Sequence, residues 1–363
     1  MDKLIILFVC LILFRNLVSY DTHGVASTQG LRLAMEDFYE VKITKRYAFF
    51  GVYDGHAGDE VAKYASKYLR KNIVNDSKFN IDMRWALNNA FFKTHYDMGD
   101  FSEKQGSTAV VALIKDNKIY AANTGDSRIV LLQQYRPKSL SEDHKPLEED
   151  FDFLAGKINK YSGNISMGPY EKIQRFADYF KKYKEAVRIY DAGGNVSVGY
   201  NRVNGTLAMS RALGDKYLAH AGVIPEPEIM EKKIVLSNHY DIDKFLILAS
   251  DGLWDVLRNK DAYNLIINSK NCLEAAEILK GTALKKGSQD NITVVVVNIE
   301  NVLKKMQRLE FISQVSNAGL LLSGVIAVYL LWNNKELIKN KTLELGHNYA
   351  PEFFSFDFTT VVN

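Results

Sequence analysis

The sequence predicts an α+β fold built on antiparallel β-sheets. Segments with helix and strand patterns occur in blocks along the chain, whereas a doubly wound parallel sheet needs strict alternation. Three short strand-like runs between residues 107 and 132 are separated by tight turns, which is typical of an antiparallel meander. The length of 363 residues allows one large domain, or two, with a sizeable core.

The first elements surround one apolar stretch. Residues 47–53 are rich in aromatic and β-branched side chains and predict a buried central strand that ends at Asp54. A shorter strand is expected over residues 38–43. Residues 59–72 carry apolar side chains at helical spacing, and residues 82–97 are a second helix candidate.

Later elements follow with one interruption. Residues 148–186 are rich in aromatic residues and lysine, show no strand alternation, and indicate an inserted segment. Residues 261–284 predict mostly helix. The remaining strands are predicted over residues 107–114, 119–123, 128–132 and 245–249, and at the end of residues 287–297.

Composition excludes several classes of protein. The chain has 46 basic and 43 acidic residues, so its net charge of +3 gives no reason to expect a nucleic-acid partner. Cys10 and Cys272 are its two cysteines, which excludes a disulfide framework and a cysteine-rich zinc site. A reducing compartment is therefore expected for the folded domain.

Two apolar segments lie outside the globular pattern. The run within residues 1–20 has the length of a signal-peptide core or a short membrane anchor. Residues 311–334 carry no charge and predict a transmembrane helix, with an amphipathic helix packed on the domain or on a partner as the alternative. These limits leave a domain at residues 21–300 and a C-terminal tail at residues 335–363.

Several aspartates share one kind of position, beside the end of a predicted strand. A single acid there is usually a cap or a turn former. Several acids that converged without basic partners would repel one another unless cations held them, and Mg²⁺ or Mn²⁺ accepts such oxygen ligands. The set comprises Asp37, Asp54, Asp251 and Asp290 at strand ends, Asp126 in a hairpin tip, and Asp255 one helical turn after Asp251.

The motifs around these acids resemble the metal-dependent protein phosphatases, the type 2C serine/threonine family. They occur in the order of that family over residues 21–300. The matching motifs are Arg32 with Met35-Glu36-Asp37, residues 49–58 (FFGVYDGHAG), Gly106-Ser107-Thr108, Asn123 with Gly125-Asp126-Ser127-Arg128, Asp143-His144-Lys145-Pro146, Arg202-Val203 with Gly205, Ser210-Arg211 with Gly214-Asp215, Ser250-Asp251-Gly252 with Trp254-Asp255, and Asp290-Asn291.

The resemblance implies a central sandwich of two antiparallel sheets flanked by helices, with two metal ions at one end. Asp54 would bridge the two ions and the Gly55 carbonyl would help bind one of them. Asp251 and Asp290 would bind the other ion, and Asp37 would hold metal-bound water. Glu36 would lie just outside these ligands and orient water, and Asp126 and Asp255 match positions linked to a third, weaker metal.

The implied reaction is hydrolysis of phosphoserine and phosphothreonine in proteins by a water shared between two cations. Arg32 would grip the phosphate oxygens, unless it forms only a surface salt bridge. His56 would protonate the leaving oxygen, unless it only bonds a carboxylate at a turn. Other phosphoryl-transfer classes lack their motifs, since Cys272 has no arginine six residues later and no phosphate-binding glycine loop occurs.

Two departures from the family pattern stand out. Ala57 replaces the usual glycine after Asp54-Gly55-His56, which could tighten the local backbone. The insertion at residues 148–186 falls where the family carries a flap beside the active site. It either helps to select the phosphoprotein substrate or is a loop without that role.

Glycosylation sequons within the chain bear on its location. Asn204 and Asn291 lie in glycosylation sequons within the family motifs, so a lumenal domain is disfavoured. We expect a monomeric catalytic domain that faces the cytosol, tethered to a membrane that could be the endoplasmic reticulum. The rival functions are a pseudophosphatase that only binds partners and a membrane scaffold with secondary activity.

Overall fold

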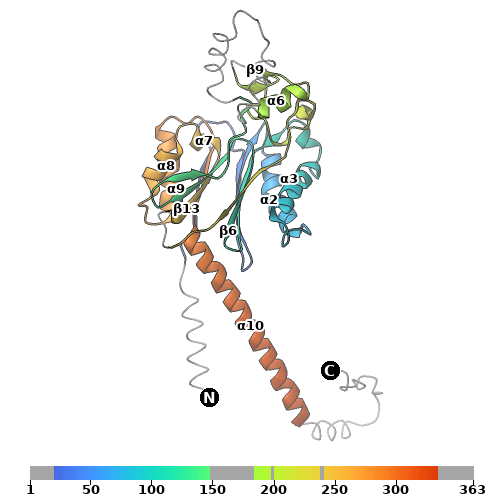
Figure 1. Ribbon diagram of the computed structural model, residues 1–363, viewed down its shortest axis with the longest axis vertical. Coiled ribbons are helices and arrows are strands. Elements are labelled where there is room, and N and C mark those ends of the chain that lie inside the picture. The colour runs from blue at the N-terminus through green and yellow to red at the C-terminus, as the bar shows by residue number, and fades with distance from the viewer. Residues whose placement is uncertain (1–19, 148–183, 198–199, 238–240, 334–363) are drawn as a thin grey trace, which may run out of the picture. The chain divides into compact units, whose positions relative to one another are not determined.

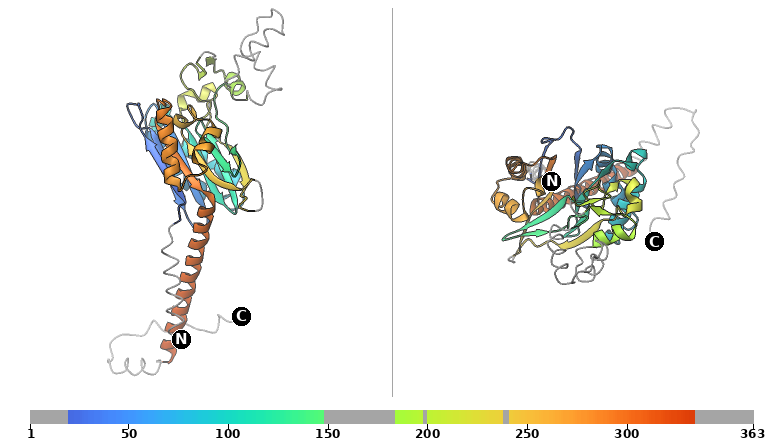
Figure 2. Two further views of the ribbon diagram at one scale, coloured as in Figure 1. Left: turned by 90° about the vertical axis from the view of Figure 1, so that its left-hand side faces the viewer. Right: turned by 90° about the horizontal axis from the view of Figure 1, so that it is seen from above.

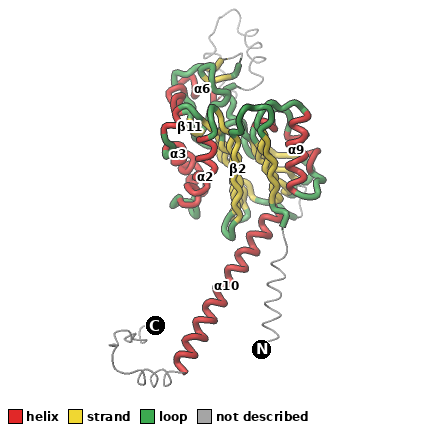
Figure 3. Tube along the Cα trace, turned by 180° about the vertical axis from the view of Figure 1, so that it is seen from behind, coloured by secondary structure: helices red, strands yellow, loops and turns green. Residues whose placement is uncertain are grey.

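The computed structural model describes residues 20–147, 184–197, 200–237 and 241–333. Two antiparallel sheets pack face to face, and helices cover both outer faces (Figure 1). Figure 3 shows the same layers from behind, with the strands in yellow between two groups of red helices. The predicted α+β sandwich is therefore confirmed.

The first sheet is centred on the predicted apolar strand. Its order is β11-β4-β3-β5-β6-β12, with β2 paired to β3 beside this path. Helices α2 (Glu60–Asn75) and α3 (Met83–Tyr96) cover its outer face. The strands are β2 (Asp37–Ile43), β3 (Ala48–His56), β4 (Gly106–Ser107), β5 (Ala109–Lys115), β6 (Lys118–Thr124), β11 (Leu213–Gly214) and β12 (Glu228–Lys233).

The second sheet has the order β1-β14-β13-β7-β8. Its outer face is covered by α7 (Asp251–Trp254), α8 (Asn259–Ile266) and α9 (Cys272–Lys285). The strands are β1 (His23–Thr28), β7 (Arg128–Gln133), β8 (Pro137–Ser139), β13 (Asp243–Ala249) and β14 (Ile292–Asn298).

The three-strand meander predicted over residues 107–132 is only half right. Strands β5 and β6 form a hairpin, and its turn places Asp116 and Asn117 at φ values of 51° and 58°, which these two residue types tolerate. Strand β7 pairs with β13 and β8 instead of β6. The turn at residues 124–127 therefore carries the chain from one sheet to the other.

The mostly helical stretch predicted over residues 261–284 contains two helices. Helix α8 ends at Ile266, and α9 begins at Cys272 after Asn271. The Asn271 side chain accepts a hydrogen bond from the Glu274 amide and so caps the new N-terminus.

Strand β3 is apolar on both faces because it is packed between two layers of the fold. Ala48, Phe50 and Val52 lie in the interior between the sheets, whereas Phe49 and Tyr53 lie against α2 and α3. All five are fully or almost fully buried. Burial of each phenylalanine stabilises the fold by about 2–3 kcal/mol relative to an exposed side chain, so both layers are anchored on this strand.

A small lobe lies at one end of the sandwich (Figures 1 and 2). It contains α6 (Lys184–Asp191), β9 (Val196–Ser197), β10 (Arg202–Val203) and the short 3₁₀ helix η3 (Lys216–Ala221), around an apolar cluster of its own. Residues 184–186 of the predicted insertion thus belong to α6. The rest of the insertion lies outside the described residues.

The C-terminal region begins with α10 (Ile299–Asn333), and the chain divides into two compact units, Met1–Arg308 and Leu309–Asn363. Ile299, Val302 and Met306 bury their side chains in the interior of the sandwich. Within the described residues, no helix combines the length and apolar character needed to cross a membrane, so the predicted transmembrane helix at residues 311–334 is not supported. The N-terminal segment at residues 1–19 and the tail lie outside the described residues.

Candidate functional site

Two of the predicted acids meet at the paired ends of β2 and β3. Asp37 lies directly opposite Asp54 in this antiparallel pair, so both side chains share one face of the sheet. The Gly55 amide donates a hydrogen bond to the Glu36 carbonyl at 3.1 Å. A Cβ atom on Gly55 would lie 2.6 Å from that carbonyl oxygen, so the close approach requires glycine.

The second sheet brings its acids to the same place. Strand β13 ends just before Ser250 and Asp251, and β14 begins just after Asp290 and Asn291. Because β13 and β14 are antiparallel neighbours, these residues share one edge. The Ser250 hydroxyl donates a hydrogen bond to Asp37 Oδ2 at 2.8 Å and so joins the two sheets at the acidic end.

Asn291 holds the loop that carries Arg32. Its side-chain oxygen accepts a hydrogen bond from the Glu36 amide at 2.7 Å. Its amide nitrogen donates to the carbonyls of Gln29 and Ala34 at 2.7 and 3.0 Å. Arg32 is more than half exposed and forms an ion pair with Asp290 at the rim of the acidic cluster. The loop is thus tied to the strand that follows Asp290.

Crowding of carboxylates dominates the electrostatics. Burial raises the pKa of Asp37 to about 6, with the Asp290 charge adding to the effect. Burial and the neighbouring charges of Asp37 and Asp251 raise the pKa of Asp54 well above its usual value. The pKa of Asp251 rises in the same way, through burial and the charge of Asp126. These acids therefore favour a bound cation.

Asp126 and Asp255 complete the acidic group. Asp126 is fully buried and forms an ion pair with Lys145. Its Oδ1 atom, like Oδ1 of Asp37, has no hydrogen-bond partner among the described residues. Asp255 lies one helical turn after Asp251, and burial raises its pKa. All the predicted acids therefore gather at one end of the sandwich.

The donor set fits a hard divalent cation, since it consists of carboxylates and one carbonyl with unpaired buried oxygens. In the described part of the chain, however, no three His, Cys, Asp or Glu side chains form a ready-made metal site. Mg²⁺ usually keeps several waters and needs only one or two protein carboxylates, so the two observations agree.

His56 lies beside this cluster at the last position of β3. Its Nε2 atom is 2.6 Å from Oδ2 of Asp215, which is buried. Burial alone would lower the pKa of His56, but the hydrogen bond to Asp215 outweighs it and raises the pKa. The next residue, Ala57, has a φ of 57°, a left-handed conformation that costs a residue with a side chain about 1–2 kcal/mol.

Several motif residues for which the sequence predicts no role support the acids through hydrogen bonds or ion pairs. Thr108 receives the Asp54 amide hydrogen bond at 3.1 Å and returns one from its own amide to the Asp54 carbonyl at 2.9 Å. Lys145 neutralises Asp126, and Ser250 bonds to Asp37. Such partners lie far apart in the chain, so only their shared occurrence in one motif set could have indicated them.

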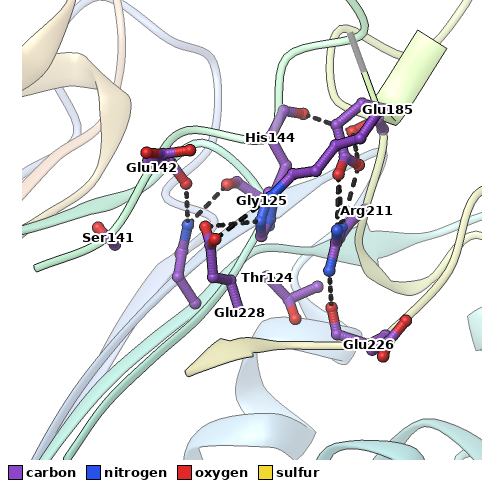
Figure 4. A network of polar contacts seen from close by, with 12 residues as sticks. Thr124, Gly125, Ser141, Glu142, His144, Glu185, Arg211, Glu226 and Glu228 are labelled. Atoms are coloured by element: carbon purple, nitrogen blue, oxygen red, sulfur yellow. Dashed lines mark hydrogen bonds and ion pairs between the residues drawn. The ribbon is translucent and has the colours of Figure 1, made fainter. Parts of the chain in front are cut away.

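A buried ion pair connects the small lobe to this end of the sandwich (Figure 4). Arg211 donates to both carboxylate oxygens of Glu185 at 2.6–3.1 Å. Next to Arg211, the Ser210 amide donates to the His144 carbonyl at 2.7 Å. The ring of His144 accepts a hydrogen bond from the Gly125 amide at 3.1 Å, so the network reaches the residue before Asp126.

Comparisons with known sequences agree with this geometry. The family model described as Protein phosphatase 2C matches residues 23–150 and 180–292. A probable protein phosphatase 2C 52 of Oryza sativa subsp. japonica is 36% identical over 287 residues, which are 77% of this chain and 50% of the rice protein. A probable protein phosphatase 2C 69 of Arabidopsis thaliana is 35% identical over 76% of this chain and 69% of its own length.

Solved structures give the same fold. The crystal structure of serine-threonine phosphatase 2C from Toxoplasma gondii superposes with a TM-score of 0.59 at 19% identity, covering 77% of this chain and 96% of that chain. At that identity the likeness establishes the fold alone. The sequence matches are closer and span most of the sandwich. The chain belongs to the protein phosphatase 2C family.

Proposed function

We propose that this chain hydrolyses phosphoserine and phosphothreonine in proteins with the help of Mg²⁺ or Mn²⁺. The observation that carries the proposal is the convergence of Asp37, Asp54 and Asp251, whose pKa values are raised by burial and by one another. A folded protein without such a role would gain stability by replacing one of these repelling acids.

The acids at this end of the sandwich would supply ligands for a pair of metal ions and for a separate third ion. Asp54, the Gly55 carbonyl, Asp251 and Asp290 would bind the pair, with Asp37 and Glu36 holding associated water. Asp126 and Asp255 would serve the third ion. Bound divalent cations supply the positive charge that lowers the pKa of a water nucleophile and stabilises the phosphoryl oxygens.

The remaining steps belong to side chains of this chain. Arg32 is exposed at the rim and can donate two parallel hydrogen bonds to phosphate oxygens, in competition with Asp290. His56 donates a proton to the serine or threonine oxygen as the phosphorus–oxygen bond breaks. No covalent enzyme intermediate is required.

The rival proposal is a pseudophosphatase that keeps the fold and binds partners. Such a chain would be expected to lack some of the acids, Arg32 or His56, and here all are present and close to one end of the sandwich. Activity on proteins also fits the exposed position of Arg32, which a phosphorylated segment can reach.

We also propose that the domain faces the cytosol and that the N-terminal apolar run within residues 1–20 tethers it to a membrane. The amide nitrogen of Asn291 is occupied by two hydrogen bonds in a buried setting, so a glycan there would disrupt the loop that carries Arg32. Protease access to the domain in intact membrane vesicles, together with alkaline extraction, tests this. A protected domain, or one released freely into solution, would contradict it.

The activity is tested with the full chain and a phosphothreonine peptide in Mg²⁺, Mn²⁺ or EDTA. Asp54→Asn and Asp251→Asn should abolish turnover that depends on metal. The control is Asp97→Asn, which removes an exposed partner of Lys93 and should leave turnover unchanged. Absence of turnover by folded wild-type protein would refute the phosphatase proposal and favour the pseudophosphatase.

A further inference from the structure

Two exposed leucines flank the proposed phosphate-binding arginine. Leu31 is 71% exposed, Leu33 is fully exposed, and Arg32 stands between them. They are the two most exposed leucines among the residues that the structure describes. We propose that Leu31 and Leu33 contact the substrate beside its phosphate, so that the chain prefers segments with apolar side chains next to the phosphorylated residue. This inference rests on the proposed function and deepens it by naming a class of substrate.

The loop that carries these leucines is fixed in place. A single exposed leucine on a protein surface needs no explanation, so the pair is informative only together with its setting. The Asn291 side chain donates to the carbonyls of Gln29 and Ala34, one on each side of residues 31–33. Within the loop, the Gln29 side chain donates to the Arg32 carbonyl at 2.7 Å. The backbone is therefore held at both ends and in its middle.

The loop also packs directly on the strand end behind it. A Cβ atom on Gly30 would lie 2.2 Å from the Asp290 carbonyl oxygen, and Gly30 has a φ of 62°. Glycine allows both the close approach and this left-handed conformation. Asp290 and Asn291 thus set the position of the loop, and the two leucines are exposed at a fixed place next to the acidic cluster.

Chain geometry brings the neighbours of a phosphorylated residue to these leucines. Consecutive Cα atoms lie about 3.8 Å apart, so Leu31 and Leu33 are as close to Arg32 as the flanking residues of a peptide are to its phosphorylated residue. A peptide whose phosphate contacts the Arg32 guanidinium therefore places its flanking side chains near the leucines. Apolar side chains there would bury surface on both partners, whereas polar ones would lose water without gaining a partner.

The fixed backbone makes such a contact effective. The loop loses its conformational freedom when the domain folds, so little further ordering of the loop opposes the burial of leucine surface on binding. A bilayer is the other partner that exposed leucines can suit. Because Arg32 is the proposed phosphate ligand, the pair is continuous with the site that a phosphoprotein segment has to reach. This continuity favours a peptide over a bilayer.

The test compares peptides that differ only beside the phosphate. One phosphothreonine peptide carries leucine on both sides of the phosphothreonine, and its partner carries serine at the same two positions. With the full chain in Mg²⁺, we expect kcat/KM to be about fivefold or more higher for the leucine peptide. The double variant Leu31→Ser, Leu33→Ser should bring the ratio of the two kcat/KM values close to one.

Two control variants make the result specific. Leu273→Ser removes another exposed leucine, which lies beside Gly24 near the start of β1, whereas the leucine pair follows the end of that strand. This variant should keep the wild-type ratio. The double variant Leu31→Met, Leu33→Met keeps apolar surface and should also keep the preference. Turnover of p-nitrophenyl phosphate, which has no flanking residues, reports whether the site of each variant is intact.

Each outcome has a distinct meaning. A preference that disappears in the serine variant and persists in both controls supports the inference. Equal hydrolysis of the two peptides by wild type, or a preference that survives in the serine variant, overturns it while the phosphatase function stands. The second result, combined with weaker sedimentation of that variant with phosphatidylcholine vesicles, would assign the leucines to a bilayer instead. Folded wild-type protein that hydrolyses none of the three substrates refutes the proposed function, and the substrate preference fails with it.

Discussion

Replacement of Glu185 by glutamine should cost more stability than any exposed ion pair in the domain. Glu185 is 5% exposed, and its carboxylate contacts Arg211 at 2.6 Å (Figure 4) and Arg188 at 2.7 Å. Glutamine keeps the shape but leaves two guanidinium groups without their anion. Removal of one partner from a buried pair costs about 3–5 kcal/mol, and the partly exposed Arg188 places this site near 3 kcal/mol. That corresponds to a melting temperature lower by roughly 6–12 °C.

Thermal and urea unfolding of the full chain, followed by circular dichroism, measure this loss. The matched control is Glu300→Gln, which removes an exposed partner of Lys304 and should cost less than about 1 kcal/mol. If the two variants lose the same stability, the reasoning about buried charge is refuted.

Acid adds a second readout for Glu185. Burial alone would raise the pKa of this carboxyl, but Arg211 and Arg188 outweigh it and hold the pKa well below its usual 4.5. A depressed pKa contributes stability that is present above 4.5 and is lost as the pH falls below it. Glu185→Gln should therefore lose less stability than wild type between neutral pH and pH 4 or lower. Parallel curves of unfolding free energy against pH for the two proteins would contradict this.

Three further predictions concern metal, pH and backbone strain. Mg²⁺ or Mn²⁺ added to EDTA-treated protein should raise the melting temperature, because a cation at 100 times its Kd stabilises the folded state by about 2.7 kcal/mol. Asp54→Asn should remove most of this rise. An undiminished rise in that variant would exclude Asp54 as a ligand. Burial and the charge of Lys216 lower the pKa of His95 from 6.5 to about 4, so this neutral ring contributes stability that is full above pH 6.5 and is lost as the pH falls towards 4. The loss should reach about 2–3 kcal/mol in urea titrations and be absent in His95→Gln; an equal loss in the variant would assign it to other groups. Ala57→Gly should raise the free energy of unfolding by about 0.5–1 kcal/mol through relief of the left-handed conformation, and a decrease in urea-melt midpoint would contradict the strain.

Local patterns in the sequence determined most of the elements and the type of site. The apolar run that forms β3 predicted a buried central strand, and the structure buries one face of it against helices and the other against the second sheet. The acids at strand ends indicated a cation site, and the structure gathers all of them at one end of the sandwich. Side-chain spacing and strand-end position are local properties, so the sequence alone could supply them.

Tertiary structure decided which segments meet. The turn at residues 124–127 looked like another hairpin, yet β7 found its partners in β8 and β13. Glu185 lies within the predicted insertion at residues 148–186, yet the structure makes it the buried partner of Arg211. His56 and Asp215 are brought together only by the pairing of β3 and β11 with β4. Contacts of this kind join residues far apart in the chain, and they depend on the order of strands in the sheet and on the space that a glycine leaves. Residue periodicity within one segment carries no information about either.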